Sequence, residues 1–431
     1  MRPSIYIILC LLSASSSEAT LVSRTANRIH HAAVRRSARL ARDIRSILSN
    51  VLIDQPIIGP DSGNRVYCVA NPSGTVHKST SSTPTPTSGG NGVIVSSITS
   101  GSSSSRRPSP TSTSGGGPVS TFTSDWKLAE TREGASFFDG WDFWSSSDPT
   151  HGIVDYLTLQ DAQSNGLIGM NSDGNVLMKV ETTGKIPGNR KSVRIHSKNI
   201  FNGGLLILDS VHMPAGCGTW PAFWSNGPNW PAGGEIDIIE GVNDYTNNQA
   251  TLHTNPGCGL ASTDPRALSI SGTLVGGMDC AVGSTSNQGC GVRANSNTTY
   301  GAGFNRIGGG VYAMQWDSSG ISVFFFPRGS IPADIVAEAP QPSTWGLAMA
   351  RWPAINCDPF KFFYDNIAIL DTTLCGDWAA GVWSSSGIPG QEQSCAARTG
   401  FATCEDFVRN SGHAFQEAYW EIKSYKRYQK N

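Results

Sequence analysis

Alternating apolar and polar positions dominate the chain from about residue 125 to its end. In these segments every second side chain is hydrophobic, which is the pattern of a β-strand with one buried face. Clusters of Gly, Asn, Asp and Pro separate the segments, as turns do. The clearest segments are Ser192–His196, Leu205–Leu208, Tyr312–Trp316, Ile321–Phe326 and Tyr419–Ile422. Helical periodicity is scarce there, so the pattern predicts an all-β fold.

One hairpin connection and one helix are predicted within this region. Asp317–Gly320 joins two predicted strands and is expected to form a hairpin loop. A short helix is expected at Cys404–Asn410. The region holds about 300 residues without another linker, which suits one large domain over residues 124–431.

The first residues have the order of a secretory signal peptide. Arg2 is followed by the apolar run Ile5–Leu12 and then by small residues up to Ala19, which predicts a signal peptide over residues 1–19. The apolar run is shorter than the about 20 residues that a transmembrane helix needs, and no longer one follows. We therefore expect a secreted extracellular protein, free or associated with the cell wall, without a transmembrane segment.

Residues 20–70 are interpreted as a basic pro-segment. Apolar residues lie between its arginines as on an amphipathic helix. The segment could contact anionic surfaces, mark processing at Arg35–Arg36, or be a solvated helix without a role in catalysis. Its arginines are Arg24, Arg28, Arg35, Arg36, Arg39, Arg42 and Arg45. Residues 71–123 are rich in Ser, Thr, Pro and Gly, cannot form a core, and are predicted to be an O-glycosylated linker.

Cysteine usage fits an exported protein. Removal of the signal peptide removes Cys10, leaving Cys68 in the N-terminal region and eight cysteines between Cys217 and Cys404. They lack the paired C-x-x-C spacing of zinc sites, so we expect disulfides and no metal. The pairing is not fixed by the sequence, and Cys68 is left over.

Composition narrows the classes of partner. A formal net charge of −1 at pH 7 gives no field to attract nucleic acid, whereas 12 Trp and 48 Gly favour an aromatic groove for a polymer. The chain contains no G-x-S-x-G, H-E-x-x-H or phosphate-loop motif. Asn297–Thr299 is an N-glycosylation acceptor. We expect a monomer that needs no cofactor.

The chemistry is expected on the run Glu235–Glu240, whose sequence is EIDIIE. On a regular strand Glu235 and Asp237 would face one side and Glu240 the other. A β-bulge at Ile238–Ile239 would return Glu240 to the side of the other two acids. Three acids without neighbouring bases, on a strand that packs against a core, cost free energy of folding. This cost favours a functional role for them.

The spacing predicts a retaining glycosidase. With the bulge, inward-leaning Glu235 and Glu240 bring their carboxyl groups to about 5–6 Å, the separation found in retaining enzymes. One carboxylate attacks the anomeric carbon and the other donates a proton to the leaving oxygen. Asp237, lying between them, holds a charge or a shared proton that separates the pKa values of the outer pair.

The sequence around these acids resembles glycoside hydrolase family 16, in particular its fungal laminarinase-like members. The resemblance covers nearly all of residues 125–429. It rests on Cys217–Trp224, Asn229–Asn243, Phe137–Phe143, Ser192–Ile195, Leu252–Thr254 and Leu374–Trp378. It implies a concanavalin-like jelly-roll β-sandwich with a concave cleft, with Glu235 as nucleophile, Glu240 as acid/base and Asp237 as assisting acid. The implied substrates are β-1,3-glucans and mixed β-1,3/1,4- or β-1,6-branched glucans.

Aromatic and polar residues near the acids are candidate contacts for sugar. Indole faces stack on pyranose rings, which makes Trp220, Trp224 and Trp230 candidates, with core packing as the alternative. His253 is expected beside Glu240 on the same face, at the start of an alternating run. Arg194 is a candidate donor to sugar hydroxyls, and Trp345 a candidate stacking partner.

Two other functions remain open. A β-glucan transglycosylase shares the first half of the reaction and differs only in whether water or a sugar hydroxyl resolves the intermediate. A non-catalytic glucan-binding wall protein could use the same sandwich. A lectin has no need of both Glu235 and Glu240, so hydrolysis is the leading hypothesis.

Overall fold

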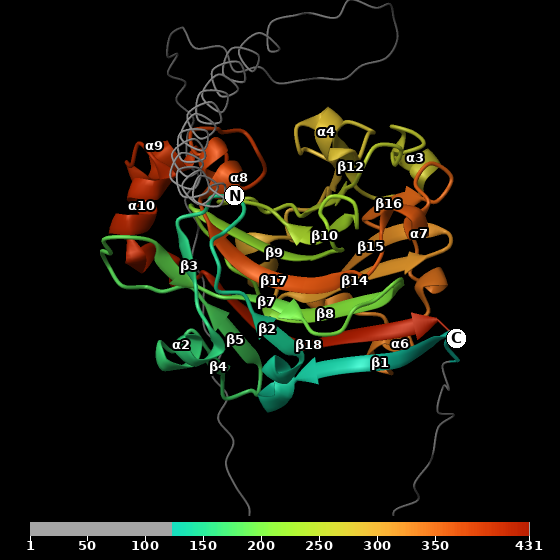
Figure 1. The fold of residues 1–431 in the computed structure, drawn as a ribbon, viewed down its shortest axis with the longest axis horizontal. Helices are drawn as coiled ribbons and strands as arrows, with labels where there is room; N and C mark the ends of the chain where they lie inside the picture. The colour runs from blue at the N-terminus through green and yellow to red at the C-terminus, as the bar shows by residue number, and fades with distance from the viewer. Residues whose placement is uncertain (1–122, 431) are drawn as a thin grey trace, which may run out of the picture. The chain divides into compact units, whose positions relative to one another are not determined.

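A computed structural model describes residues 123–430. The predicted signal peptide, basic pro-segment and Cys68 lie outside these residues, as does the linker except for Thr123. Two large antiparallel sheets form the domain, and short helices lie at their edges, with α8–α10 gathered on the left, α4 at the top, and α3 and α7 on the right of Figure 1. The predicted all-β sandwich is confirmed. Among the described residues, no helix is long and apolar enough to cross a membrane.

One sheet, called the back sheet, includes four of the predicted strand segments in full. Its strands, in spatial order, are β16 (Ala350–Pro353), β15 (Gly320–Pro327), β14 (Gly310–Asp317), β8 (Gly204–His212), β18 (Tyr419–Lys430), β5 (Val176–Lys179) and β4 (Ile168–Met170), with β1 (Trp126–Glu133) also paired to β18. The turn between β14 and β15 follows Asp317, so the predicted hairpin is confirmed.

The other sheet, called the acid sheet, carries the EIDIIE run on its central strand. Its strands, in spatial order, are β12 (Thr273–Gly276), β13 (Cys290–Arg293), β11 (Gln249–His253), β10 (Glu235–Glu240), β9 (Thr219–Asn226), β17 (Ile367–Leu374), β7 (Arg194–Ser197) and β2 (Trp141–Phe143). The predicted strand Ser192–His196 is wrong in one respect, because it is divided at Val193. Its first part belongs to β6 (Arg190–Ser192), which pairs in parallel with β3 (Val154–Tyr156).

The helices are short and lie in the connections. The predicted helix Cys404–Asn410 is present as α10. The others are α2 (Leu159–Ser164), α3 (Pro265–Leu268), α4 (Val282–Thr285), α5 (Gly301–Arg306), α6 (Ala333–Val336), α7 (Pro359–Phe362), α8 (Gly376–Gly381) and α9 (Cys395–Thr399), with 3-10 helices at Gly134–Gly140, Arg328–Ser330, Pro342–Thr344 and Gly412–Phe415. Most of these helices have three to six residues, which is too little periodicity to be predicted from sequence.

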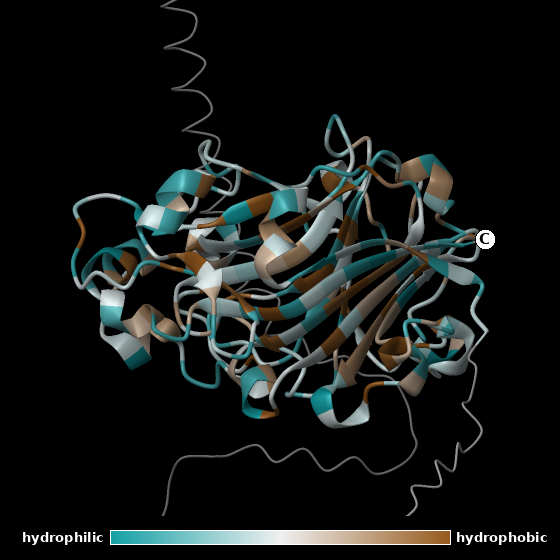
Figure 2. Cartoon of the chain, turned by 90° about the horizontal axis from the view of Figure 1, so that it is seen from below, coloured by the Kyte–Doolittle hydropathy of each residue, from teal (hydrophilic) through white to brown (hydrophobic). Residues whose placement is uncertain are grey.

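The core lies between the inward faces of the two sheets. Hydrophobic and hydrophilic positions alternate along the strands (Figure 2), and the hydrophobic ones meet in the middle. Leu206 and Leu208 of β8 belong to this core together with Ile236 of β10 and Leu252 of β11. Burial of each such side chain contributes about 1.5–3 kcal/mol. This packing fixes which face of β10 is free to carry acids.

All eight cysteines between Cys217 and Cys404 form disulfides, which confirms the predicted framework. The pairs are Cys217–Cys395, Cys258–Cys357, Cys280–Cys290 and Cys375–Cys404. Asn297 of the glycosylation acceptor is exposed, whereas Thr299 is buried. Its glycosylation stays a prediction.

Candidate active site

Strand β10 carries a bulge at Ile238. Its register against β9 shifts between Asp237 and Ile239, so Ile238 has no cross-strand partner of its own. A bulge adds one residue and thereby reverses the alternation beyond it. Glu240 is returned to the face of Glu235, and the predicted bulge is confirmed.

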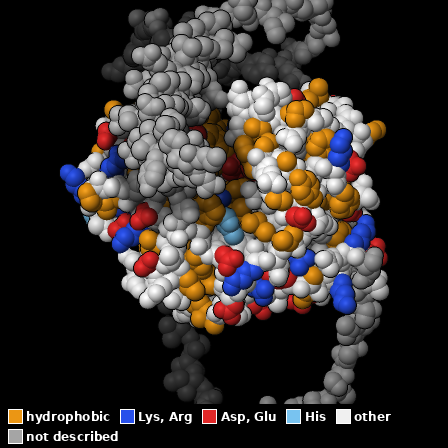
Figure 3. Space-filling model, in the orientation of Figure 1, with side chains coloured by type: hydrophobic (Ala, Val, Ile, Leu, Met, Phe, Trp, Pro, Cys, Tyr) orange, Lys and Arg blue, Asp and Glu red, His pale blue; other side chains and the backbone are white. Residues whose placement is uncertain are grey.

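The acids lie over the middle of the acid sheet. Figure 3 shows this face of the molecule hollowed, with acidic and hydrophobic side chains gathered in the hollow. Asp237 is 2% exposed, whereas Glu235 and Glu240 on either side of it are partly exposed. The outer two acids can therefore reach a ligand, and Asp237 lies buried between them.

Each outer acid accepts a hydrogen bond from an indole N–H. Trp230 Nε1 donates to Glu235 Oε2 over 2.5 Å, and Trp220 Nε1 donates to Glu240 Oε1 over 2.9 Å. The sequence predicts both tryptophans as stacking surfaces, and this donor role is additional. Trp230 as a whole is 43% exposed, so part of its surface is accessible to a sugar while its indole N–H holds the carboxylate.

His253 contacts a different acid from the one predicted. It ends β11 instead of beginning an alternating run, and it pairs across the ladder with Glu235. Its Nε2 lies 3.3 Å from Asp237 Oδ2. The expected face is confirmed, since the charge of His253 also acts on Glu240. Its direct contact is Asp237 instead of Glu240, because β11 pairs with the first half of β10, before the bulge. His253 supports the buried acid.

Burial and mutual repulsion raise the pKa values of the three acids. Burial, followed by the charge of Asp237, raises the pKa of Glu235 to about 8. Burial also raises the pKa of Asp237 to about 8, against the lowering effect of its hydrogen bond with Glu235. The pKa of Glu240 is raised well above its usual range, again first by burial and then by Asp237. A site with several such acids keeps protons at neutral pH.

Arg194 is buried beneath the cleft and does not present free donors to it. Its Nη1 lies 3.6 Å from Asp371 Oδ2 and 4.0 Å from Asp148 Oδ1. Its guanidinium also lies over the rings of Trp144 and Trp224, 5.2 and 5.0 Å from their centroids. At 5% exposure, this placement does not support the predicted role as a sugar donor. Arg194 instead neutralises acids and orients Trp224.

Four further residues on this face were missed by sequence reasoning. Asp371 faces the cleft from β17, and burial raises its pKa to about 7 although Arg194 lowers it. Arg194 Nε donates to Nε2 of His196, and burial followed by the charge of Arg194 lowers the pKa of His196 to about 3. Trp144 stacks on that imidazole, and Asp148 completes the group. The apolar run Ile367–Leu370 directly before Asp371 contains a signal for this acid, since an acid within a buried strand needs a partner.

Trp345 lies away from the acids, which corrects its prediction as a stacking partner. Its ring packs edge-on against Phe324 and Phe326, and its N–H donates to Asp334 over 2.8 Å. These residues cover the outer face of the back sheet with Leu205. The whole sandwich therefore separates Trp345 from the cleft.

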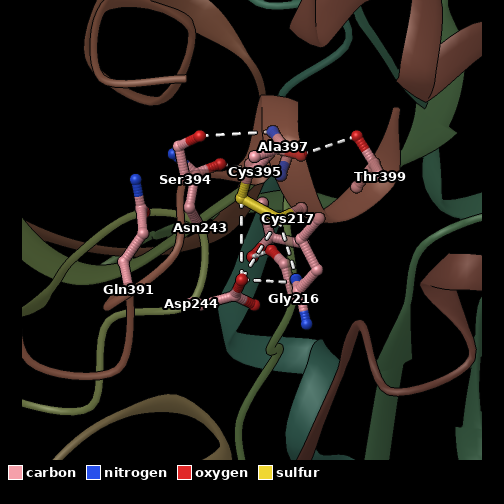
Figure 4. Close-up of polar contacts among 12 residues, drawn as sticks. Gly216, Cys217, Asn243, Asp244, Gln391, Ser394, Cys395, Ala397 and Thr399 are labelled. Carbon is pink, nitrogen blue, oxygen red and sulfur yellow. Dashed lines mark hydrogen bonds and ion pairs between the residues drawn. A yellow bond between two sulfur atoms is a disulfide. The ribbon is translucent and has the colours of Figure 1, made fainter. Parts of the chain in front are cut away.

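The loop after Glu240 is fastened to the Cys217–Cys395 disulfide. Asp244 lies beside this disulfide (Figure 4), 3.1 Å from the sulfur of Cys217. It also pairs with Arg398 over 2.5 Å. Asn243 accepts a hydrogen bond from the backbone of Gly218. The backbone beyond Glu240 is thus held on both sides.

One group of side chains could hold a cation. Glu235, Asp237 and His253 each offer a ligand atom, and these atoms lie within 4.8 Å of one another. The imidazole of His253 is already paired with the carboxylate of Asp237. The carboxylate of Glu235 already accepts a hydrogen bond from the indole N–H of Trp230. The donor set therefore fits proton chemistry better than metal binding. Cys217, Cys395 and Asp244 form a second such group, but both sulfurs are in a disulfide.

Comparisons with known proteins agree with this geometry. Residues 141–428 match a family model described as "XgeA-like, catalytic GH16 domain". A probable glycosidase of Schizosaccharomyces pombe is 44% identical over 307 residues, which cover 70% of this chain and 69% of that protein. A probable endo-1,3(4)-β-glucanase of Aspergillus clavatus is 43% identical over 312 residues, 71% of this chain and 47% of that protein. The chain thus spans less than half of that Aspergillus relative.

Two solved structures are similar over the described domain. Laminarinase 16A of Phanerochaete chrysosporium, with 6-O-glucosyl-laminaritriose in donor and acceptor sites, is 36% identical with a TM-score of 0.63. The similarity covers 70% of this chain and 99% of that one. A chain described as an elongating GH family 16 β-1,3-glucosyltransferase is 38% identical, with the same TM-score and coverage of 70% and 100%.

Proposed function

The chain belongs to glycoside hydrolase family 16, and from this membership we propose that it hydrolyses β-1,3-linked glucan internally with retention of anomeric configuration. The proposed substrates include mixed β-1,3/1,4- and β-1,6-branched glucans. The observation that carries the proposal is the bulge at Ile238, which turns Glu240 to the face of Glu235. Each of these two acids also accepts one indole N–H.

Glu235 is the proposed nucleophile. The indole N–H of Trp230 stabilises its charged form, as do the nearby charges of His253 and Arg194. One oxygen of Glu235 attacks the anomeric carbon as the bond to the leaving glucosyl oxygen breaks, forming a glycosyl ester.

Glu240 is the proposed acid/base. Its raised pKa keeps a proton available, and Trp220 holds Oε1, leaving Oε2 to carry that proton to the departing oxygen. The resulting carboxylate then removes a proton from water, which attacks the ester and releases the sugar with its original configuration.

Asp237 is the proposed assisting acid. It is buried between the other two and paired with His253. When Glu235 becomes an ester, its charge is lost, and repulsion on Asp237 falls. Asp237 then ionises more readily, which compensates for the charge that the site has lost.

Loss of either outer acid tests these roles. Glu235→Ala and Glu240→Ala should each lower kcat on laminarin by at least about 10²-fold, the lower end of acid–base contributions. With azide, Glu240→Ala should yield the β-glycosyl azide and Glu235→Ala the α-anomer, since azide replaces a different group in each. Glu421→Gln on the back sheet, where Asn171 contacts the carboxylate, is the matched control. Unchanged reducing-sugar release by Glu235→Ala would exclude the mechanism.

Transglycosylation is the second candidate, favoured by the similarity to the elongating β-1,3-glucosyltransferase. It differs only in the acceptor that attacks the ester. Product masses from a panel of β-1,3, mixed-linkage and branched glucans separate the two. Chain-lengthened products at high oligosaccharide concentration would support transfer, and only shortened ones would support hydrolysis.

We also propose that the chain is secreted and that residues 124–431 are its catalytic domain. The sequence order of signal peptide, basic segment and linker supports this division. N-terminal sequencing of the secreted protein tests it. Cleavage after Ala19 is expected for signal removal alone, and cleavage after Arg36 for further processing.

A further inference from the structure

A single buried side chain spans the bulge in β10. The side-chain amide of Asn248 accepts a hydrogen bond from the backbone N–H of Glu240 at Oδ1 over 2.9 Å. Its Nδ2 donates to the carbonyl of Ile238, also over 2.9 Å. An inserted residue disrupts the ladder locally, and this amide bonds the backbone on both sides of the disruption.

Asn248 is itself fixed from behind. It is fully buried, its backbone N–H donates to Thr299 Oγ1 over 2.9 Å, and its carbonyl accepts from Ala294 over 2.8 Å. Its Nδ2 also approaches the sulfur of Met349 at 3.8 Å. The residue is thus held while its amide group is directed at β10.

The chemistry of the contact is specific to an amide of this length. One end of the side chain must accept from an N–H and the other must donate to a carbonyl. An ionised Asp can accept but not donate, and Leu can do neither. A buried polar group in this position costs free energy unless both ends are satisfied. Asn248 satisfies both only when the bulge is present.

Without the bulge, β10 has another register. On a regular strand Glu240 alternates to the side of Ile236 and Ile238, which is the core. The position of the acid/base therefore depends on which register is more stable. The two hydrogen bonds of Asn248 favour the register that keeps Glu240 in the cleft.

We propose that Asn248 is a positioning residue that holds Glu240 in place as acid/base by locking the bulge. This inference rests on the proposed function. It assigns to Asn248 an effect on proton donation to the leaving group and none on the nucleophile, which lies before the bulge.

Leaving-group dependence tests the inference. Laminari-oligosaccharides have a poor leaving group that needs a proton, whereas a 2,4-dinitrophenyl β-laminaribioside needs none. Asn248→Ala should lower kcat on the oligosaccharide about 100-fold, as a displaced general acid would. On the dinitrophenyl substrate we expect a change of less than about threefold in the step that forms the glycosyl ester.

Two further variants make the result decisive. Asn248→Leu keeps the side-chain volume but removes both the acceptor for Glu240 and the donor to Ile238, so it should show the same selectivity, and it covers the case in which the alanine variant does not fold. Asn247→Ala is the matched control, because this neighbouring buried asparagine donates to Ala294 over 2.8 Å and not to β10. It should change both rates by less than about threefold. Thermal unfolding confirms that each variant is folded.

Each outcome has a distinct meaning. Equal loss on both substrates, or no loss on either, would overturn the positioning role of Asn248. Glu240→Ala should show the same selectivity more strongly. A wild-type protein that cleaves neither substrate, or a Glu240→Ala variant without this selectivity, would overturn the proposed function and the inference with it.

Discussion

The indole N–H of Trp230 donates to Glu235 Oε2 across 2.5 Å. Trp230 is among the more exposed large hydrophobic residues of the described domain, whereas the acid it holds faces a cleft of buried groups. One residue thus supplies both a hydrogen bond to Glu235, the proposed nucleophile, and an accessible aromatic side chain for sugar. These two contributions can be separated by substitution.

Trp230→Phe keeps an aromatic surface but removes the donor. The hydrogen bond lowers the pKa of Glu235, so its loss should raise that pKa and shift the acidic limb of the kcat/KM profile to higher pH. Hydrogen bonds to charged groups contribute about 1.5–3 kcal/mol, which corresponds to at least about a tenfold fall in kcat/KM at the optimum. Trp345→Phe removes an indole donor to an acid on the opposite side of the sandwich and should leave the profile unmoved. An unshifted acidic limb in Trp230→Phe would contradict the role of the indole.

Stability should fall as pH rises through the range in which the buried acids ionise. The pKa of Asp237 is raised from 3.8 to about 8 in the fold, so the folded state binds its proton more tightly than the unfolded state. Its contribution is complete below about pH 4 and is lost as pH rises to about 8. Asp237→Asn should therefore flatten the decline in the free energy of unfolding between pH 4 and 8 by at least about 1 kcal/mol.

Asp317 provides a control of opposite sign. Burial raises its pKa, but hydrogen bonds from Ser319, Gln315 and Lys430 outweigh that effect and lower it to about 2. Its contribution is present above about pH 4 and is lost as pH falls towards 2. Asp317→Asn should leave the slope between pH 4 and 8 unchanged. Urea titrations at several pH values measure both, and a wild-type slope of zero there would contradict the prediction for Asp237.

The disulfides should contribute unequally to stability. Cys217 and Cys395 are 178 residues apart, and Cys280 and Cys290 are 10 apart. The chain-entropy relation gives about 5 kcal/mol for the long loop and about 3 kcal/mol for the short one. Replacing each pair by alanine and measuring urea unfolding should show the larger loss for Cys217–Cys395. Equal losses would indicate that loop length does not govern these contributions.

Arg194 should be important for stability because it neutralises buried acids. Arg194→Met leaves Asp371 and Asp148 without their cation, and breaking a buried pair costs about 3–5 kcal/mol. The loss should be smaller in an Asp371→Asn background, since one of the unpaired charges is then absent. Arg351→Met on the back sheet, where no ion pair within residues 123–430 involves this arginine, should change stability by less than about 0.5 kcal/mol. Additive effects of Arg194→Met and Asp371→Asn would contradict the pairing.

Local patterns predicted much of the fold and the centre of the site. Alternation indicated four strands of the back sheet and part of β7 in the acid sheet. The spacing Glu235, Asp237, Glu240 required a bulge that the structure contains. These features depend on residues that are close together in the sequence, so a local sequence pattern is enough to predict them.

Contacts between distant segments could not be predicted in the same way. Arg194 looked like a free donor, because its partners on β17 and in the loop before β3 are far away in sequence. The sequence did not indicate on which side of the sandwich Trp345 lies, because its location depends on its contacts with Phe324 and Phe326 of the back sheet. The short helices and the disulfide pairing depend on the same long-range packing.

The bulge also determines how the arrangement of the three acids would respond to the loss of one residue from β10. Deleting Ile238 would leave the sequence EIDIE, in which alternate positions of an unbulged strand bring all three acids to one side. The deletion would remove one isoleucine from the core. Asn248 would then face a strand without the bulge that its two hydrogen bonds span. The same three acids can thus share one face on an unbulged strand of five residues or on a bulged strand of six. This chain has the bulged strand, and its core accommodates the additional isoleucine.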